Sequence, residues 1–392
     1  MLGFSFCSHN TSIILRSGSQ SLSALTRLFL LISIPILVGV SAFLFARHAF
    51  IVPLDSGNKS IVVVEVAPGK SFKQICSELK SKGVIRYAWA LDMLARFRKE
   101  DTRVNAGEYE LSPSMSPRSV LAKLVSGEVL RRPLTIREGV SIWEIGVLVE
   151  KAGILTAEDF NKALRDAGLL ARAGIASSSF EGYLYPETYF FSRPITAEDI
   201  IWRMLEEGDR HWPQEFTDKA DQVRLSRHEI LTLASIIEKE AGNKEEMPKI
   251  SSVFHNRLSQ GMKLQSDPTV IYGLNNFNGD LTKDDLQNPH PWNTYTHFGL
   301  PPGPIANPSE AAIQAALFPE ETTYLFFVAD GSGGHVFSTT LQEHNEAVNK
   351  YQRSGAAAKR GESSAAAAAA NPAAPSESTP APSTAPAADG TH

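Results

Sequence analysis

The sequence contains few cysteines, no cluster of basic residues and none of the common metal or nucleotide motifs. Two cysteines in 392 residues exclude a fold held together by disulfides. The ten histidines never form HExxH or a zinc-type spacing with cysteine, so we expect no metal and no other cofactor. A GxSxG nucleophile elbow is also missing. The formal net charge is −5 and Lys and Arg are scattered, which argues against a nucleic-acid partner.

One long apolar run lies near the N-terminus, at residues 28–46 (LFLLISIPILVGVSAFLFA). As a helix rising about 1.5 Å per residue it would span roughly 28 Å, close to the thickness of the hydrocarbon core. A cleaved signal peptide is the alternative, but the run is longer than such a core and no small-x-small cleavage motif follows it. We therefore expect a retained transmembrane helix preceded by a cytoplasmic segment, residues 1–27. Cys7 and Cys76 would then lie on opposite sides of the membrane and could not pair.

The next part of the chain contains an internal repeat, because residues 64–85 and 134–155 show one pattern at an offset of 70. Each copy predicts a short strand, a glycine turn at Gly69 or Gly139, a serine N-cap and an amphipathic helix. Between the copies, residues 107–111 predict another strand. The pattern indicates an α+β domain, and the length of the chain indicates a second domain after it.

The densest pattern in the chain starts at Ser226. Ser226 and Glu229 form a capping box, and Gly242 predicts a left-handed end to the helix. Between them one face is apolar, at Ile230, Leu233, Ala234, Ile237 and Ala241. Two carboxylates, Glu238 and Glu240, lie late in this helix, each about 80° from the centre of the apolar stripe and on opposite sides of it.

A carboxylate at the margin of a buried face loses water, so its pKa rises and it can carry a proton near neutral pH. A general acid needs this property. The alternative is that Glu238 and Glu240 are ordinary solvated residues at the edge of the face. Helical geometry alone does not choose between the two side chains.

Three later segments are candidates for binding a sugar. The loop 265–269 (QSDPT) offers donors and acceptors that suit the hydroxyls and acetamides of an amino sugar, although Asp267 before Pro268 is also a good N-cap. The Pro/Gly-rich segment 293–303 predicts a rigid loop. The aromatic segment 180–191 (FEGYLYPETYFF) could stack on sugar rings or fill a core.

Residues 324–340 predict a hairpin with a Gly-rich turn, where His335 could face a cleft but is expected to pack at the end of the hairpin. From residue 354 to residue 392 the chain is mainly Ala, Pro and Ser and has few apolar residues. Such a segment cannot bury enough surface to fold, so we expect a disordered tail.

The runs ASIIEKEAG, VFHNRL, LQSDPTVIYG and NTYTHFGLPPGPIANP, in this order and spacing, resemble the endolytic murein transglycosylase (YceG-like) family over residues 61–351. The resemblance implies that Glu240, the second Glu of the EKE triplet, is the catalytic residue. It also implies a LysM-like domain at residues 61–130, for which a generic packing unit is the alternative, and an α+β catalytic domain at residues 131–353. Expected substrate-binding residues are Gln265, Asp267, Thr269, Tyr272, Asn293, Tyr295, Glu187 and Tyr185.

The implied activity is cleavage within peptidoglycan strands, at the bond between N-acetylmuramic acid and N-acetylglucosamine, to give 1,6-anhydro ends and stop chain elongation. The resemblance further implies a single-pass protein of the inner membrane with a cytoplasmic N-terminus and a periplasmic catalytic domain. A peptidoglycan synthase would be its partner. Two alternatives stay open: a muramidase that uses water, with Glu238, Asp267 or Glu187 as second carboxylate, and a non-catalytic scaffold that binds peptidoglycan.

Overall fold

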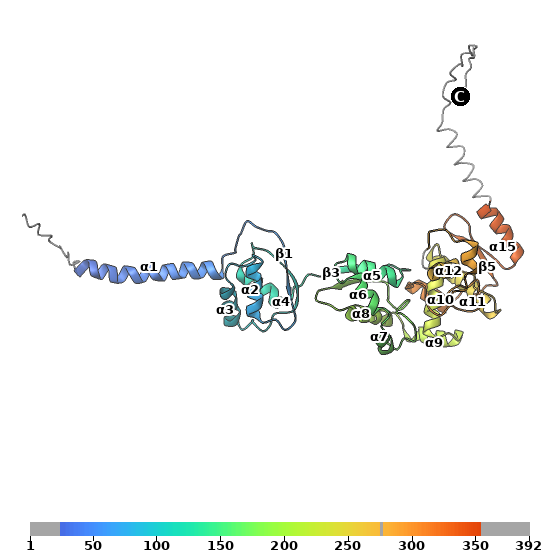
Figure 1. The fold of residues 1–392 in the computed structure, drawn as a ribbon, viewed down its shortest axis with the longest axis horizontal. Helices are drawn as coiled ribbons and strands as arrows, with labels where there is room; N and C mark the ends of the chain where they lie inside the picture. The colour runs from blue at the N-terminus through green and yellow to red at the C-terminus, as the bar shows by residue number, and fades with distance from the viewer. Residues whose placement is uncertain (1–23, 275–276, 354–392) are drawn as a thin grey trace, which may run out of the picture. The chain divides into compact units, whose positions relative to one another are not determined.

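The computed structural model describes residues 24–274 and 277–353, so the predicted tail at 354–392 lies outside the described residues. The described chain is α+β, as predicted, and its strands pair into two-stranded antiparallel sheets (Figure 1). It divides into two compact units. The N-terminal unit runs to Arg131 and includes Ser192–Pro194, and the C-terminal unit contains Arg132–Phe191 and the chain from Ile195 onward.

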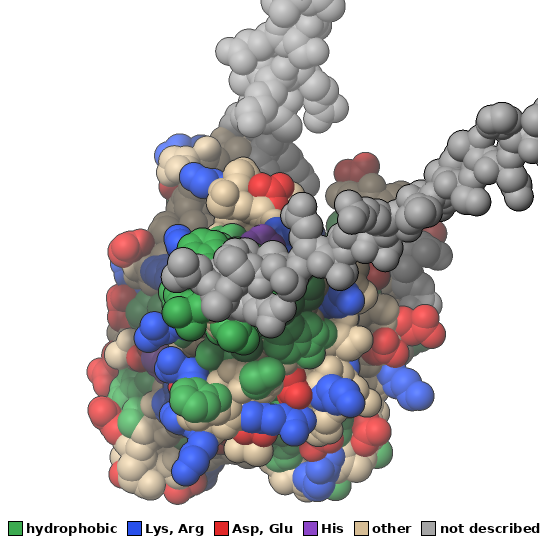
Figure 2. Space-filling model, turned by 90° about the vertical axis from the view of Figure 1, so that its left-hand side faces the viewer, with side chains coloured by type: hydrophobic (Ala, Val, Ile, Leu, Met, Phe, Trp, Pro, Cys, Tyr) green, Lys and Arg blue, Asp and Glu red, His purple; other side chains and the backbone are tan. Residues whose placement is uncertain are grey.

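The N-terminal unit begins with a long apolar helix, α1 (Ala24–Phe50). Within it, Leu31–Phe50 has a mean hydropathy of 1.7 and is long and apolar enough to cross a membrane, which agrees with the expectation for residues 28–46. Pro35 lies inside the helix, as membrane helices tolerate. Figure 2 views the molecule from the side of α1 and shows hydrophobic side chains in the middle, with acidic and basic side chains intermixed around them.

After α1, the N-terminal unit has the order strand, helix, helix, strand, helix. Its two strands pair antiparallel, with Val64 opposite Tyr109. Both of these side chains are fully buried and form the core together with the apolar faces of the helices. The elements are β1 (Val62–Val66), α2 (Phe72–Ser81), α3 (Ala88–Arg98), β2 (Gly107–Leu111) and α4 (Pro117–Ser126).

The C-terminal unit is mainly helical and contains two short hairpin-like sheets. One pairs β3 (Arg132–Thr135) with β4 (Thr188–Phe191), and the other pairs β5 (Phe326–Ala329) with β6 (His335–Ser338). Its helices are α5 (Ile142–Lys151), α6 (Ala157–Ala163), α7 (Ala167–Arg172), α8 (Ala197–Arg210), α9 (Gln214–Val223), α10 (Arg227–Glu240), α11 (Met247–Ser259), α12 (Asp267–Gly273), α13 (Lys283–Gln287), α14 (Glu310–Leu317) and α15 (Leu341–Val348), with short turns η1 (Lys244–Glu246) and η2 (Asn349–Arg353).

The repeat seen in the sequence is real at the level of local structure. Strand β3 begins 70 residues after β1, and helix α5 begins and ends 70 residues after α2. Gly69 and Gly139 both have a positive φ, 75° and 71°, so both turns use the left-handed conformation that glycine adopts without strain. The predicted serine N-cap of α5 is Ser141, which forms a capping box with Glu144.

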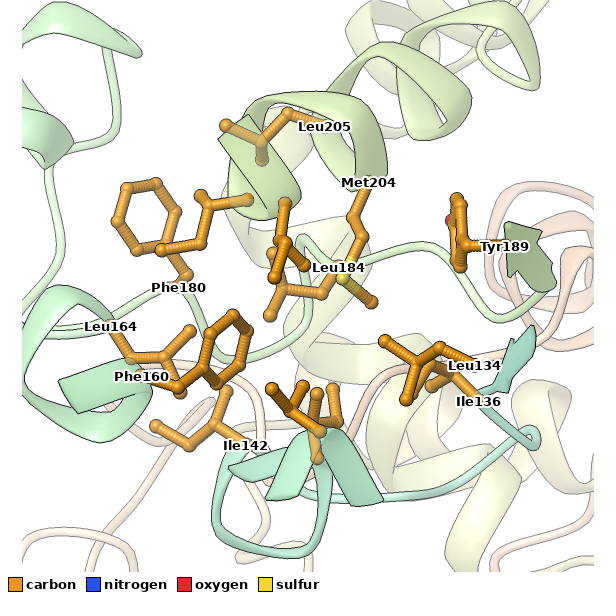
Figure 3. Close-up of a cluster of buried hydrophobic side chains, with 14 of the residues drawn as sticks. Leu134, Ile136, Ile142, Phe160, Leu164, Phe180, Leu184, Tyr189, Met204 and Leu205 are labelled. Carbon is orange, nitrogen blue, oxygen red and sulfur yellow. The ribbon is translucent and has the colours of Figure 1, made fainter. Parts of the chain in front are cut away.

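Two hydrophobic cores stabilise the C-terminal unit. The first gathers side chains from β3, β4, α5, α6 and α8, and Figure 3 shows Leu134, Phe160, Leu184 and Met204 converging in it. The second surrounds α10, which packs against α14 and α11. Because α10 is enclosed along most of its length, the residues at its C-terminal end are held in fixed positions.

Candidate active site

Helix α10 carries the candidate acid at its last residue, Glu240. The predicted capping box is present: the Ser226 hydroxyl accepts from the Glu229 amide, and the Glu229 carboxylate accepts from the Ser226 amide. Every residue from 230 to 237 is buried. This burial orients the helix, so the two carboxylates after it project from the enclosed part in defined directions.

The predicted left-handed end at Gly242 is wrong. The helix ends at Glu240, and its C-cap, Ala241, has an extended backbone (φ −70°, ψ 127°). Glycine is required at position 242 for a different reason, because a Cβ there would lie 2.3 Å from the carbonyl oxygen of Gly333 in the β5–β6 turn. The close approach brings this turn against the end of the Glu240 helix.

The structure separates the two carboxylates that helical geometry left equivalent. Glu238 Oε2 accepts hydrogen bonds from the amide and the hydroxyl of Ser309, at 3.0 and 2.5 Å. Ser309 is the N-cap of α14, so Glu238 joins two packed helices. Glu240 lies on the other side, where its Oε1 accepts from the Ser266 hydroxyl at 2.6 Å.

Glu240 lines a cleft of about 510 Å³ in the C-terminal unit. The cleft is open enough for a sugar, and both polar and aromatic side chains line it. Its walls come from α10, α11, the loop before α12, the β5–β6 hairpin and α15. The lining residues are Glu240, Arg257, Leu264, Gln265, Asp267, Tyr295, Phe326, Phe327, Val328, Ala329, His335, Leu341, His344 and Val348.

The environment of Glu240 keeps a substantial fraction of this carboxyl protonated near neutral pH. Burial raises the pKa of Glu240 from 4.5 to about 7. The hydrogen bond from Ser266 and the positive charges of His335 and Arg257 lower this pKa, whereas the negative charge of Asp267 raises it. A carboxyl with a pKa near 7 can give up a proton and take it back at neutral pH, which general acid–base catalysis requires.

Buried threonines hold the loop that presents Ser266. The Ser266 amide donates to Thr294 Oγ1 at 3.0 Å, and the Thr269 hydroxyl donates to the Ser266 carbonyl at 2.6 Å. The two threonine hydroxyls lie 2.8 Å apart. The neighbouring Asn293 is fully buried and donates to backbone carbonyls of Leu286 and Asn288. This network fixes the Ser266 hydroxyl where it meets Glu240.

A nearly buried cation, Arg257, forms part of the wall of the cleft. Arg257, on α11, is 8% exposed and donates to the carbonyls of Leu325 and Leu264 at 2.6 and 2.8 Å. It also donates to Gln265 Oε1 at 3.3 Å. Burial lowers the pKa of Arg257, whereas Tyr295 and Glu240 raise it. Arg257 thus joins the β5 end of the hairpin to the loop and places a positive charge in the cleft.

The β5–β6 hairpin contributes His335. Its Nδ1 lies 2.9 Å from Glu246 Oε2, and its backbone amide donates to Glu246 Oε1 at 3.0 Å. Both contacts hold the imidazole at the edge of the cleft, where its charge acts on Glu240. The expectation that His335 packs at the end of the hairpin is therefore incomplete, because the same side chain also lines the cleft.

The C-terminal unit contains a second cleft, of about 650 Å³. The two clefts are lined by consecutive residues, Glu240 and Asp267 in the first and Lys239 and Pro268 in the second. The second cleft has a mostly apolar lining: Ser141, Trp143, Glu144, Lys239, Pro268, Ile271, Tyr272, Leu274 and Ile305.

Behind the second cleft lies a buried carboxyl, Glu181. Its oxygens accept from the Ile142 amide, the Tyr272 hydroxyl and the Asn307 side chain at 3.2, 3.1 and 3.3 Å. Burial raises the pKa of Glu181 from 4.5 to about 8, and the bond from the Ile142 amide lowers it. Glu181 thus joins the start of α5, helix α12 and the loop at Asn307.

Comparison with known proteins assigns the chain to a family. A model of the YceG-like family matches residues 64–350, which is most of the chain. The chain belongs to the YceG-like family. A Bacillus subtilis (strain 168) protein named endolytic murein transglycosylase is 33% identical over 326 residues, covering 79% of this chain and 90% of that protein.

Two further YceG-family comparisons agree. A Streptococcus pneumoniae (serotype 2, strain D39) endolytic murein transglycosylase is 30% identical over 328 residues, which are 76% of this chain and 59% of that longer protein. A crystal structure of a YceG-like protein from Listeria monocytogenes superimposes with a TM-score of 0.52 at 35% identity, covering 74% of this chain and 99% of that one.

The structure brings together some of the residues that the sequence predicted for substrate binding. Gln265, Asp267 and Tyr295 line the cleft beside Glu240, and the Tyr295 hydroxyl donates to Asp267 Oδ1 at 2.6 Å. Tyr272 lines the second cleft. These side chains remain candidates for contact with substrate.

The other predicted binding residues are not in the cleft. Thr269 and Asn293 are fully buried and hold the loops. Tyr185 stacks on His211, with ring centroids 4.2 Å apart, and donates to Glu310. Glu187 is exposed and accepts from the Thr188 amide at 2.7 Å. None of these four side chains lines the Glu240 cleft. They can affect substrate binding only indirectly, by positioning other residues.

Two residues of the site were missed as individual candidates: Arg257, which lines the cleft, and Ser266, which contacts Glu240. The sequence did indicate that Arg257 is unusual. It lies on the apolar face of its helix, seven residues after Ile250, and a charged side chain is rarely buried without a partner. Ser266 belongs to the polar loop 265–269, but its contact with Glu240 could not be predicted because the two residues are 26 positions apart in the chain.

Proposed function

We propose that this chain is a lytic murein transglycosylase in which Glu240 acts as both acid and base. The observation that carries the proposal is a carboxyl with a pKa near 7, held by Ser266 in an open cleft. Membership of the YceG-like family, with relatives named endolytic murein transglycosylases, supports the enzyme class and the murein substrate.

In the proposed reaction, protonated Glu240 donates its proton to the oxygen that links N-acetylmuramic acid to N-acetylglucosamine. The bond from that oxygen to the muramyl C1 breaks. The Glu240 carboxylate then removes the proton of the muramyl 6-hydroxyl, whose oxygen bonds to C1 and closes a 1,6-anhydro ring. No water is consumed and the carboxyl is restored. Positioned proton transfer of this kind accelerates a reaction by about 10²–10⁴-fold.

The cleft can also assist the charge changes of this reaction. Arg257 places a positive charge near Glu240 and stabilises its carboxylate after the first proton transfer, and His335 acts in the same direction when it is protonated. The Ser266 hydroxyl donates to the same carboxylate. Both effects favour the ionised state, while burial favours the protonated one, so neither state is strongly preferred and the proton can move in both directions.

The paired clefts suit cleavage inside a strand. A glycan that is cut away from its ends must extend beyond the reacting bond on both sides. Because residues adjacent in the chain line the two clefts, Glu240 and Asp267 in one and Lys239 and Pro268 in the other, we propose that sugars on the two sides of the bond occupy one cleft each. The rings of Tyr295 in the first cleft and Trp143 in the second are suited to stack on sugar faces.

A muramidase that uses water is the second candidate. Of the second carboxylates considered for it, Asp267 lines the cleft, whereas Glu238 is bonded to Ser309 and Glu187 does not line it. Mass analysis of the glycan ends released from isolated sacculi separates the two reactions. Anhydro ends, one water lighter than reducing ends, support the transglycosylase, and reducing muramic ends would overturn it.

We also propose that α1 anchors the protein in the inner membrane, with residues 1–27 in the cytoplasm and the chain after α1 in the periplasm. The apolar span Leu31–Phe50 supports the anchor. The β–α–α–β order of the N-terminal unit supports the LysM-like assignment and thus a role in holding glycan. An anchored enzyme that cuts new strands would end their elongation, so a peptidoglycan synthase is the proposed partner.

A further inference from the structure

Helix α3 carries a row of large apolar side chains on the face opposite its core. Leu91 and Ala95 point into the core and are fully buried. Trp89, Met93 and Phe97 follow one another at intervals of four residues and are 46%, 51% and 87% exposed. At about 100° per residue, the centre of this row lies about 180° from the buried pair. The apolar row is therefore turned away from its own domain, and exposed apolar surface of this kind marks an interaction site.

The row begins beside the outer end of the apolar helix α1. The Trp89 ring stacks on Phe45 of α1, with centroids 6.3 Å apart and planes inclined by 14°. It also meets Phe50 edge-on at 5.8 Å, and Tyr87 lies 6.1 Å from Phe45. Phe45 and Phe50 belong to the span that is long and apolar enough to cross a membrane. Trp and Tyr gather at the level of lipid headgroups in membrane proteins, and these two rings lie at that end of the span.

Basic residues flank the row. Residues 86–100 contain Arg86, Arg96, Arg98 and Lys99 against Asp92 and Glu100. Asp92 pairs with Arg96 and Glu100 with Arg98, which leaves a positive excess along the helix. An apolar row bordered by Arg and Lys is the pattern of a helix that lies in a membrane surface containing anionic lipids.

We propose that α3 lies on the outer surface of the membrane, with Trp89, Met93 and Phe97 in the boundary between headgroups and acyl chains. The partner is the lipid surface itself, because the row continues from a helix that is already suited to lipid. This inference rests on the proposed anchoring by α1. It adds that the N-terminal unit is seated on the bilayer and is not suspended from a free tether.

Site-directed labelling of the full chain in vesicles tests this inference. A Cys7→Ser background leaves Cys76, which is 1% exposed and whose pKa burial raises to about 12, so it does not react with the label. Phe97→Cys is labelled with an environment-sensitive fluorophore, in vesicles whose lipids carry a quencher near the headgroup. Glu110→Cys, at an exposed position of β2, is the control for a solvent-exposed site outside α1 and α3. Phe43→Cys, in α1, is the control for insertion.

We expect the quencher lipid to reduce emission at least about twofold at positions 43 and 97, and not at position 110. If position 43 is quenched and position 97 is not, α1 is inserted in the membrane but α3 does not lie on its surface. The proposal for α3 would then be wrong, and the apolar row would bind a protein partner instead. If position 43 is not quenched, the anchoring itself fails. Circular dichroism of each variant verifies that the fold is retained.

Discussion

The Ser266 hydroxyl donates a 2.6 Å hydrogen bond to Glu240, and the Ser309 hydroxyl donates a 2.5 Å bond to Glu238 two residues earlier on the same helix. The two contacts look alike, but their surroundings differ. Ser309 caps a neighbouring helix, whereas Ser266 sits on a loop at the edge of an open cleft. The pair therefore provides a test and a matched control at almost the same place in the fold.

The first prediction concerns the pH profile. Glu240 must be protonated to act as acid, so kcat/KM should fall as the pH rises above about 7. The bond from Ser266 lowers the pKa of Glu240. Ser266→Ala should therefore move the descending limb to higher pH, by about one pH unit. Ser309→Ala should leave the limb in place. A limb that stays fixed in Ser266→Ala, or moves in Ser309→Ala, would contradict the role given to this hydrogen bond.

The second prediction concerns stability. A carboxyl whose pKa is raised by folding contributes most to stability below 4.5 and loses that contribution as the pH rises through about 7. Gln cannot ionise, so Glu240→Gln should match the wild type at pH 4 and unfold at a higher temperature at pH 8. The shift from 4.5 to about 7 corresponds to at most roughly 3 kcal/mol. Calorimetry at the two pH values measures the difference. A lower transition temperature for the variant than for the wild type at pH 8 would contradict a buried Glu240 with a raised pKa.

The third prediction concerns Glu181, which joins the Ile142 amide, the Tyr272 hydroxyl and Asn307. Since its pKa of about 8 keeps it largely protonated at neutral pH, Glu181→Gln should preserve the fold and most of the activity. Glu181→Ala leaves three buried groups without their partner, and each unsatisfied group costs about 1–3 kcal/mol. Thermal unfolding compares the two variants. Equal losses in both would show that a charged carboxylate is required there.

The fourth prediction concerns Gly242. A methyl group there would lie 2.3 Å from the Gly333 carbonyl, so Gly242→Ala should push the hairpin turn, and with it His335, away from Glu240. We expect kcat to fall about tenfold or more, because small displacements of catalytic groups strongly reduce the rate of the chemical step. Gly57→Ala, whose Cβ would meet no atom closer than 3.5 Å, is the control. Full activity in Gly242→Ala would mean that the position of the hairpin does not matter.

Much of this fold could be predicted because its signals are local. The capping boxes at Ser141 and Ser226, the Gly turns of the repeat and the apolar span of α1 each depend on residues within one or two helical turns. The end of α10 was predicted wrongly because Gly242 was interpreted as a left-handed helix end. Position 242 is a glycine because the carbonyl of Gly333, 91 residues later in the chain, leaves no room for a Cβ.

The site was predictable to a lesser degree. Local periodicity placed Glu238 and Glu240 on the two margins of one face, and this is where they lie. It could not tell which one faces the cleft, because Ser309 and Ser266 come from distant segments. The polar loops indicated Asp267, Tyr295 and Asn293 equally well. Asp267 and Tyr295 line the cleft, whereas the Asn293 side chain donates to backbone carbonyls and is not in it. Composition cannot distinguish a side chain that shapes a loop from one that faces solvent.

The most direct test of the account compares Glu240→Gln with Glu238→Gln, measured as the rate of release of anhydro-muropeptides from isolated sacculi. The account predicts that Glu240→Gln loses about 10²–10⁴-fold or more, because the acid is removed. Glu238→Gln should stay within a few fold of the wild type, although its transition temperature should fall by about 2–4 °C, because a neutral amide oxygen accepts from Ser309 more weakly than a carboxylate, by about 1 kcal/mol. Full activity in Glu240→Gln, or a loss confined to Glu238→Gln, would contradict the assignment of Glu240 as the catalytic acid.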